Sequence, residues 1–212
     1  MRTTPRVPTA DLYLIAKESD MPRYFAPLFA TLLMLCTAAP ITAQDFSVDP
    51  VHSHVGFRIK HMGVSYVYGR FNTYQGSLTL GDEPSLSMTV QADSIDTGIA
   101  ARDAHLKNAD FFDVANHPTL SFTSTAIEET EDGYRVTGEF TMLGVSKEIT
   151  VLVIKTGEAT APRIGHRVGY HCTFTIKRTD FGMDYGVEQG SLSDEVDITL
   201  SLQYAEDTGE EE

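Results

Sequence analysis

The chain has 212 residues, 42% of which are hydrophobic, and its 30 acidic residues outnumber 16 basic ones. This length and apolar content suit one domain with a single sizeable core. The formal net charge of −14 argues against nucleic acid and against an anionic membrane surface as resident partners.

Residues 21–43 have the parts of a secretory signal peptide. Arg23 and Tyr24 are followed by the apolar run FAPLFATLLMLC and then by small residues up to Ala43, after which we expect cleavage. The apolar run is shorter than the roughly 20 residues that span a bilayer, although a retained anchor is the alternative. We interpret residues 1–20 as a start assigned too far upstream or as a disordered leader. A soluble exported protein is therefore expected.

The mature chain would begin at Gln44, carry a net charge of −15 and retain Cys172 as its one cysteine. It could then form no intramolecular disulfide, even in an oxidising compartment. We expect residues 44–205 to form the folded domain. The acidic stretch 206–212 is predicted to be a frayed, disordered tail.

From Gln44 onward, apolar and polar residues alternate with the period of two that is typical of strands with one buried face. About eight runs follow this pattern: Val55–Ile59, Gly69–Leu80 with a break at Gly76, Leu86–Ala92, Leu120–Phe122, Tyr134–Met142, Ile149–Val153, Val168–Ile176 and Val196–Tyr204. Strands of this kind form antiparallel sheets, and a long sheet removes its exposed edges by closing. An eight-stranded barrel either fills its interior with side chains or holds one small ligand.

The residues of the inward register do not decide between these two interiors. They combine aromatic side chains and methionines with the small residues Gly69, Ala92, Gly138 and Cys172. This mixture fits a tapered cavity, and it equally fits an ordinary packed core. A cysteine in this register is usually an inert packing residue.

The segment Ser94–Phe122 departs from the alternation. Its apolar and charged residues recur three and four apart, which predicts a short helix from near Gly98 to between Asn108 and Phe112. Side chains of Ser94–Thr97 are expected to accept hydrogen bonds from the first helical turn. Pro118 favours a return to extended backbone. We expect this helix, with the aromatic pair that follows it, to lie over one end of the β-structure.

Candidate chemistry is sparse. His52, His54 and His61 lie close in sequence, but no cysteine or carboxylate stands at a zinc spacing, so we interpret them as turn and rim residues. The chain contains no nucleophile elbow, phosphate loop or HExxH motif. Asp180-Phe181-Gly182 is interpreted as a strand end and turn. The charged helix residues Arg102, Asp103, His105 and Lys107 are either a solvated face or, at the mouth of a barrel, contacts for a polar head group.

Four segments resemble the YceI family of exported lipid-binding proteins: DPVHSHVGFRIKHMGVSYVYGRF, SIDTGIAARDAHLKNADFFDVANHPTLSF, the TMLGVSKEITV run and TIKRTDFGM. The resemblance runs from Phe46 to Tyr204. It implies an all-β fold, a lipocalin-like eight-stranded antiparallel barrel with a short helix capping one end. It also implies a long apolar ligand, no catalysis, no metal and, for Gram-negative members, a periplasmic location.

The leading hypothesis is a periplasmic carrier of a polyisoprenoid, an isoprenoid quinone or a fatty-acid-like amphiphile, with no cofactor. The residues expected to bind the ligand are Phe57, Phe71, Met88, Phe122, Phe140, Phe174 and Ile176 in the interior, Phe111, Phe112 and Met183 at the mouth, and Arg102 and His105 at the head group. We expect transient exchange of ligand with membranes. The sequence sets no oligomeric state, and a homodimer is compatible with it.

Two alternatives stay open. One is an enzyme that acts on a hydrophobic substrate, with His54, His105 or Asp103 as acid or base; it would require a strongly perturbed titratable pair facing the interior. The other is a redox or stress accessory protein that passes a quinone-like ligand to a membrane partner.

Overall fold

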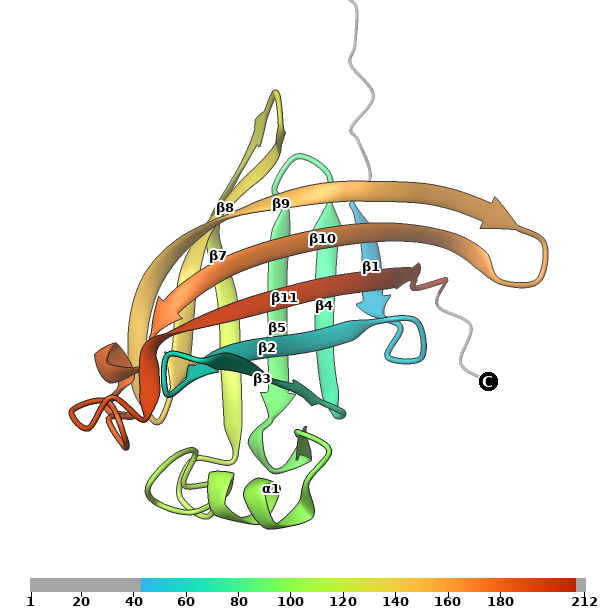
Figure 1. Ribbon diagram of the computed structural model, residues 1–212. Coiled ribbons are helices and arrows are strands. Elements are labelled where there is room, and N and C mark those ends of the chain that lie inside the picture. The colour runs from blue at the N-terminus through green and yellow to red at the C-terminus, as the bar shows by residue number, and fades with distance from the viewer. Residues whose placement is uncertain (1–42, 209–212) are drawn as a thin grey trace, which may run out of the picture. The chain divides into compact units, whose positions relative to one another are not determined.

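The computed structural model describes residues 43–208, which are almost entirely β-structure (Figure 1). The predicted leader and, apart from Ala43, the predicted signal peptide lie outside the described residues. The strands are β1 (Gln44–Val48), β2 (His54–His61), β3 (Ser65–Phe71), β4 (Tyr74–Leu80), β5 (Ser85–Gln91), β6 (Ile95–Asp96), β7 (Thr119–Thr130), β8 (Gly133–Met142), β9 (Val145–Ala161), β10 (Gly165–Lys177) and β11 (Leu192–Glu206). The helices are η1 (Ala92–Ser94), α1 (Ala100–Leu106) and η2 (Arg178–Phe181).

These segments form one closed antiparallel sheet. The ring runs in the order β1, β4, β5, β7, β8, β9, β10 and β11, and β1 returns to β11 through the pairs Phe46 with Glu206 and Val48 with Tyr204. Phe46 and Tyr204 are fully buried at this junction. The structure thus confirms the predicted eight-stranded antiparallel barrel.

Eleven strand segments make eight strands because three of the strands bend. β1 and β2 both pair with β11, and the turn at Asp49–Ser53 separates them. β3 and β4 follow the same bend, since β3 pairs with β2 while β4 pairs with β1. η1 separates β5 from β6, which pairs with the end of β3. The bends allow the strands to curve around the interior.

The sequence placed one of these breaks incorrectly. The run Gly69–Leu80 is interrupted at Asn72–Thr73, and Gly76 lies inside β4. A Cβ at Gly76 would approach the Ser87 carbonyl oxygen to 2.7 Å. This glycine therefore permits close pairing of β4 with β5 and does not interrupt the strand. The tail boundary also shifts, because β11 continues through Glu206 and the Asp207 amide donates to the Asp45 carbonyl.

Helix α1 is shorter than the spacing predicts. It begins at Ala100 and ends at Leu106, and its N-cap residue Ile99 makes no side-chain capping bond. The expected capping by Ser94–Thr97 is therefore wrong. Instead Asp96 accepts from the Gly98 amide, and Asp103 of the helix reaches back to accept from the Thr97 amide. The chain after α1 forms turns, so the aromatic pair Phe111 and Phe112 lies outside the helix.

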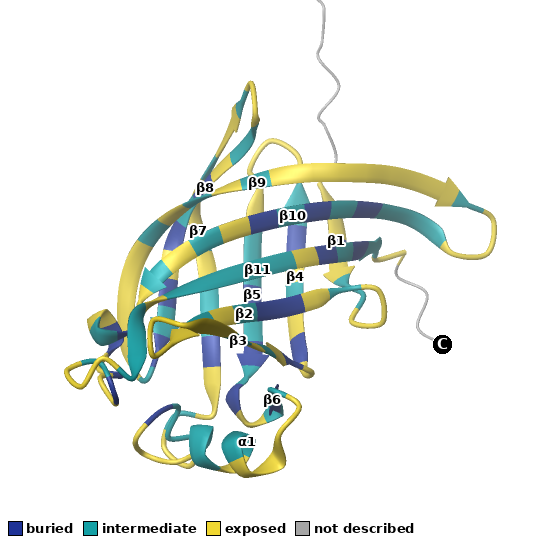
Figure 2. Cartoon of the chain, viewed as in Figure 1, coloured by how far each residue is buried: buried dark blue, intermediate teal, exposed yellow. Residues whose placement is uncertain are grey.

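The inner positions of the sheet alternate with outer ones as the sequence predicts (Figure 2). Two of the small residues predicted to point inward, Gly69 and Gly138, accommodate aromatic rings of neighbouring strands. A Cβ on Gly69 would overlap the ring of Phe57 on the neighbouring strand, and a Cβ on Gly138 would overlap the ring of Phe122. Each glycine therefore leaves room for an aromatic ring to lie flat across the adjacent strand.

The hairpin formed by β9 and β10 extends past the ring (Figure 1). Pairing of β9 with β8 ends at Val153, whereas pairing with β10 continues as far as Ala161. The overhanging part of β9 is exposed along most of its length (Figure 2).

We predict that Gly138→Ala lowers the free energy of unfolding by about 1–3 kcal/mol, because a methyl group there meets both the Phe122 ring and the Thr123 carbonyl. Gly157→Ala on β9 is the matched control, since a Cβ at Gly157 meets nothing within 4 Å. Urea unfolding of the two variants would measure the difference. Equal stability would contradict the assigned packing.

Candidate functional site

The barrel encloses a cavity of about 580 Å³, within the size range of ligand sites. It follows the inner face of β11, which contributes Leu192, Val196, Ile198, Leu200, Leu202 and Tyr204. At roughly 3.3 Å per residue, this stretch of strand is about 40 Å long. The structure therefore has a ligand-sized interior and not a fully packed core.

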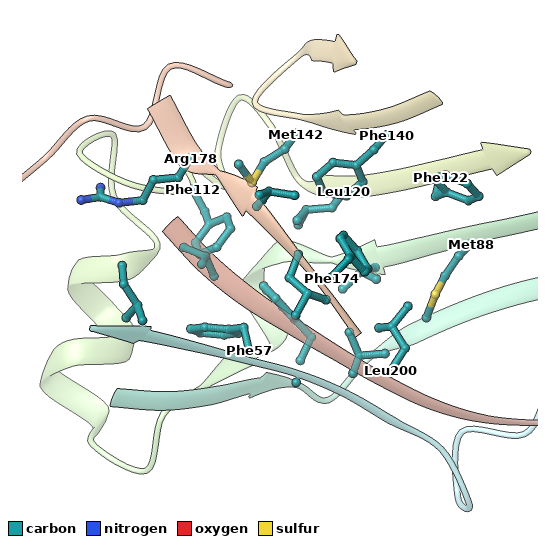
Figure 3. Close-up of a pocket in the computed structure, with 18 of the residues that line it drawn as sticks. Phe57, Met88, Phe112, Leu120, Phe122, Phe140, Met142, Phe174, Arg178 and Leu200 are labelled. Carbon is teal, nitrogen blue, oxygen red and sulfur yellow. The ribbon is translucent and has the colours of Figure 1, made fainter. Parts of the chain in front are cut away.

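The side chains predicted to bind the ligand line this cavity. The twelve residues that we expected to bind the ligand, all on the lining, are Phe57, Phe71, Met88, Arg102, His105, Phe111, Phe112, Phe122, Phe140, Phe174, Ile176 and Met183. Figure 3 shows the apolar members converging from several strands. The structure thus brings the predicted residues together, and their contact with a ligand stays a prediction.

Aromatic side chains pack together at the α1 end of the cavity. Tyr185, from the loop after η2, lies against His105 of α1 and against Phe111, with ring centroids 5.3 and 4.9 Å apart. Phe112 packs edge-on against Phe71 at 5.6 Å. These contacts join the α1 segment to the η2 loop over one end of the barrel.

The two predicted head-group residues have partners at this end. Arg102 Nε donates to the Thr97 hydroxyl at 2.7 Å, and its Nη2 donates to the Thr97 carbonyl at 2.8 Å. His105 Nε2 lies 3.2 Å from the carboxylate of Asp110. Both side chains are thus held at the rim by neighbours of their own segment.

The opposite end of the cavity is lined by Tyr170 and Tyr204. The ring centroids of Tyr204 and Tyr170 are 6.1 Å apart, and those of Tyr170 and Tyr134 are also 6.1 Å apart. Both pairs of rings meet edge-on. Burial raises the pKa of Tyr170 and raises the pKa of Tyr204 further. Both side chains line the cavity and are neutral at physiological pH.

Sequence reasoning missed Arg178, which also lines the cavity. It is the only charged side chain among residues 43–208 that is buried, with 2% exposed surface. Its Nε donates to the Ser193 carbonyl at 2.9 Å, and its Nη1 donates to the Met183 carbonyl at 3.3 Å. A signal was present, because Arg178 continues the inward register of Phe174 and Ile176 at the end of β10.

The residues considered for catalysis do not come together in the cavity. His54 is exposed on β2, and Asp103 binds Thr97. Burial raises the pKa of the Cys172 thiol to about 11, which keeps it protonated and a poor nucleophile. Within the described part of the chain, no three His, Cys, Asp or Glu side chains are arranged to hold a metal ion.

The remaining sequence features have structural roles. His52 Nδ1 lies 2.8 Å from the Asp49 carboxylate in the turn between β1 and β2. Asp180 and Phe181 lie in η2, which ends at Gly182 in the left-handed conformation, so this stretch is the predicted strand end and turn. Residues 43–208 include no helix of the length and apolar character needed to cross a bilayer.

Comparisons with known proteins agree on one family. The model of the YceI-like domain matches residues 46–204. A UPF0312 protein of Pseudomonas aeruginosa is 37% identical over 175 residues, which cover 80% of this chain and 91% of that protein. Nearly the whole folded domain is therefore shared.

Two solved structures have the same fold. BcnA of Burkholderia cenocepacia aligns with a TM-score of 0.67 at 24% identity, over 74% of this chain and 98% of BcnA. A polyisoprenoid binding domain from Saccharophagus degradans aligns with a TM-score of 0.60 at 18% identity, over 76% of this chain and 98% of that domain. At these identities the likeness establishes the barrel architecture alone.

The raised pKa of Cys172 predicts a loss of stability in alkali. A group whose pKa is higher in the folded state contributes fully to the stability of that state when the pH is below the group's unfolded pKa. This contribution disappears as the pH rises to the folded pKa. For Cys172 this interval runs from about 9 to about 11. We expect this thiol to account for about 2–3 kcal/mol of the loss.

The measurement is the free energy of unfolding between pH 8 and about 11, compared with Cys172→Ala. The variant starts from a lower stability because it leaves a small cavity, but its decline in this interval should be shallower. Parallel curves for the two proteins would show that the thiol does not carry the effect.

Proposed function

Because this chain belongs to the YceI-like family, we propose that it is a non-catalytic carrier of a long-chain apolar ligand in the periplasm. The ligand would be a polyisoprenoid, an isoprenoid quinone or a fatty-acid-like amphiphile. The observation that carries this proposal is the enclosed apolar cavity along β11. A domain of the same fold is a polyisoprenoid binding domain, which supports the choice of ligand class.

The energetics suit loading and unloading. Burying each CH₂ group gives roughly 0.8 kcal/mol relative to water, so a chain of several isoprene units gains more than the ceiling of about 20 kcal/mol for non-covalent binding. The ligand's alternative location is a bilayer, which is already apolar. Transfer from bilayer to barrel is therefore close to neutral in hydrophobic free energy, which fits transport or storage.

Exchange with a membrane would occur at the α1 end. Exposed apolar side chains gather there: Met62 and Val64 at the tip of the β2–β3 hairpin, Ile99 before α1, and Tyr185. The Met62 amide donates to the Ser191 carbonyl, so the hairpin tip is joined to the loop that carries Tyr185. Because the chain is strongly acidic, we propose contact through these apolar groups and not through charge.

The first test is native mass spectrometry of the protein purified from its own periplasm, followed by organic extraction. We expect one long-chain amphiphile per chain. A folded, empty barrel that cannot be reloaded with isoprenoids would refute the carrier function.

Phe174→Asp is expected to abolish lipid co-purification. Burying a carboxylate in the apolar interior is unfavourable, and the apolar chain of a lipid is unfavourable beside it. Phe140→Asp should act in the same way. Thr173→Asp is the matched control, since Thr173 is an exposed neighbour on the outer face of β10. Circular dichroism would confirm folding, and a folded Phe174→Asp protein that keeps its lipid would exclude this lining position.

Val64→Asp should slow transfer of a fluorescent lipid from zwitterionic vesicles by about tenfold and leave equilibrium binding unchanged, because Val64 lies outside the cavity. Val51→Asp is a close control: Val51 is 82% exposed and Val64 84% exposed, but Val51 lies in the turn between β1 and β2. Stopped-flow transfer measures the rates. Equal slowing by the two variants would argue against the α1 end as the portal.

A further inference from the structure

We propose that Arg178 is the head-group receptor of the cavity, and that the ligand is an amphiphile with an anionic oxygen head, a carboxylate or a phosphate. This inference rests on the proposed carrier function and names the class of ligand. Two buried polar atoms without a hydrogen-bond partner suggest it. In the part of the chain that the structure describes, the buried side-chain atoms without a hydrogen-bond partner are Arg178 Nη2 and the Tyr204 hydroxyl.

Both side chains line the cavity. Arg178 follows β10, and its Nε is bound to Ser193 near the start of β11, whereas Tyr204 is near the end of β11. The two unpartnered atoms therefore belong to opposite ends of the interior. Figure 3 shows Arg178 at one end of the row of apolar side chains.

The charge of Arg178 is incompletely balanced. Its protein partners are two neutral carbonyl groups, and none of the ion pairs among the described residues includes it. Burial lowers the pKa of Arg178, while the more distant charges of Asp194 and Asp184 oppose that shift. A guanidinium group keeps its proton, so the buried group is a cation with free donor capacity.

An anionic oxygen supplies what the site lacks. A carboxylate or phosphate accepts from Nη2 and neutralises the charge in surroundings where such hydrogen bonds are strongest. The Tyr204 end offers a neutral hydroxyl, which binds an anion more weakly than a cation does. The head group therefore lies at the Arg178 end and the apolar tail extends toward Tyr204.

This orientation agrees with the proposed portal. Arg178 lies beside the η2 loop, and Tyr185 of that loop contacts α1. Arg102 and His105 lie on the lining at the same end. The ligand would then enter tail first and leave its head group near the opening.

The test compares ligands that share a chain and differ in head group: palmitate, hexadecyl phosphate, hexadecanol and hexadecane. Delipidated protein is titrated by displacement of the neutral probe N-phenylnaphthylamine. We expect palmitate and hexadecyl phosphate to bind about tenfold to a hundredfold more tightly than hexadecanol. A preference for only one of the two anions would still support the proposal and would identify the head group.

Arg178→Met should remove this preference and retain binding of hexadecane. This variant leaves the Ser193 and Met183 carbonyls without the arginine donor, so circular dichroism is used to check its folding. Arg178→Lys should restore part of the preference. Arg135→Met removes an exposed arginine from the outer face of β8 and should leave the preference unchanged.

Three results would overturn the proposal: equal binding of palmitate and hexadecanol to the native protein, an unchanged preference in Arg178→Met, or loss of the preference in Tyr204→Phe alone. The last result would place the head group at the opposite end. If no chain-bearing probe binds the native protein at all, the carrier function itself fails, so failure of the two proposals can be told apart.

Discussion

The closed ring of hydrogen bonds is the constraint on which the rest of the structure depends. β11 pairs with β10 along one edge and with both β1 and β2 along the other, and β1 continues the ring to β4. Closure gives every strand an inner face and fixes the circumference of the barrel. The interior cannot shrink to fit its side chains, so the space that they leave becomes the cavity.

Alternation in the sequence was enough to predict which strand side chains face the interior. In a closed sheet, a residue's phase in the period of two decides whether it points inward, and no knowledge of distant partners is needed. Phe57, Phe122 and Phe174 could therefore be assigned to the inner face from local pattern alone. The same reasoning could not tell a cavity from a packed core, because the outcome depends on how rings such as Phe57 lie across the glycines of neighbouring strands.

Features that depend on distant partners escaped the sequence analysis. The break at Asn72–Thr73 follows from the change of neighbour from β2 to β1, which no local signal records. The buried Arg178 requires the carbonyl of Ser193, fifteen residues along the chain, to be brought against it. An arginine in an inward phase is visible in the sequence, but local pattern cannot distinguish a buried cation from one that reaches solvent at a strand end.

The overhang of β9 has a consequence for contacts between molecules. Among residues 43–208, this strand pairs only with β10 beyond Val153, so residues 154–161 present a backbone edge that no described strand pairs with. Such an edge is a template on which another chain can add a strand and begin to aggregate. Lys155 and Glu158 lie on this stretch as an ion pair, and an added strand would have to accommodate both charges. The ring of strands removes its edges by closure, whereas along this projecting edge the two charges oppose the addition of a strand.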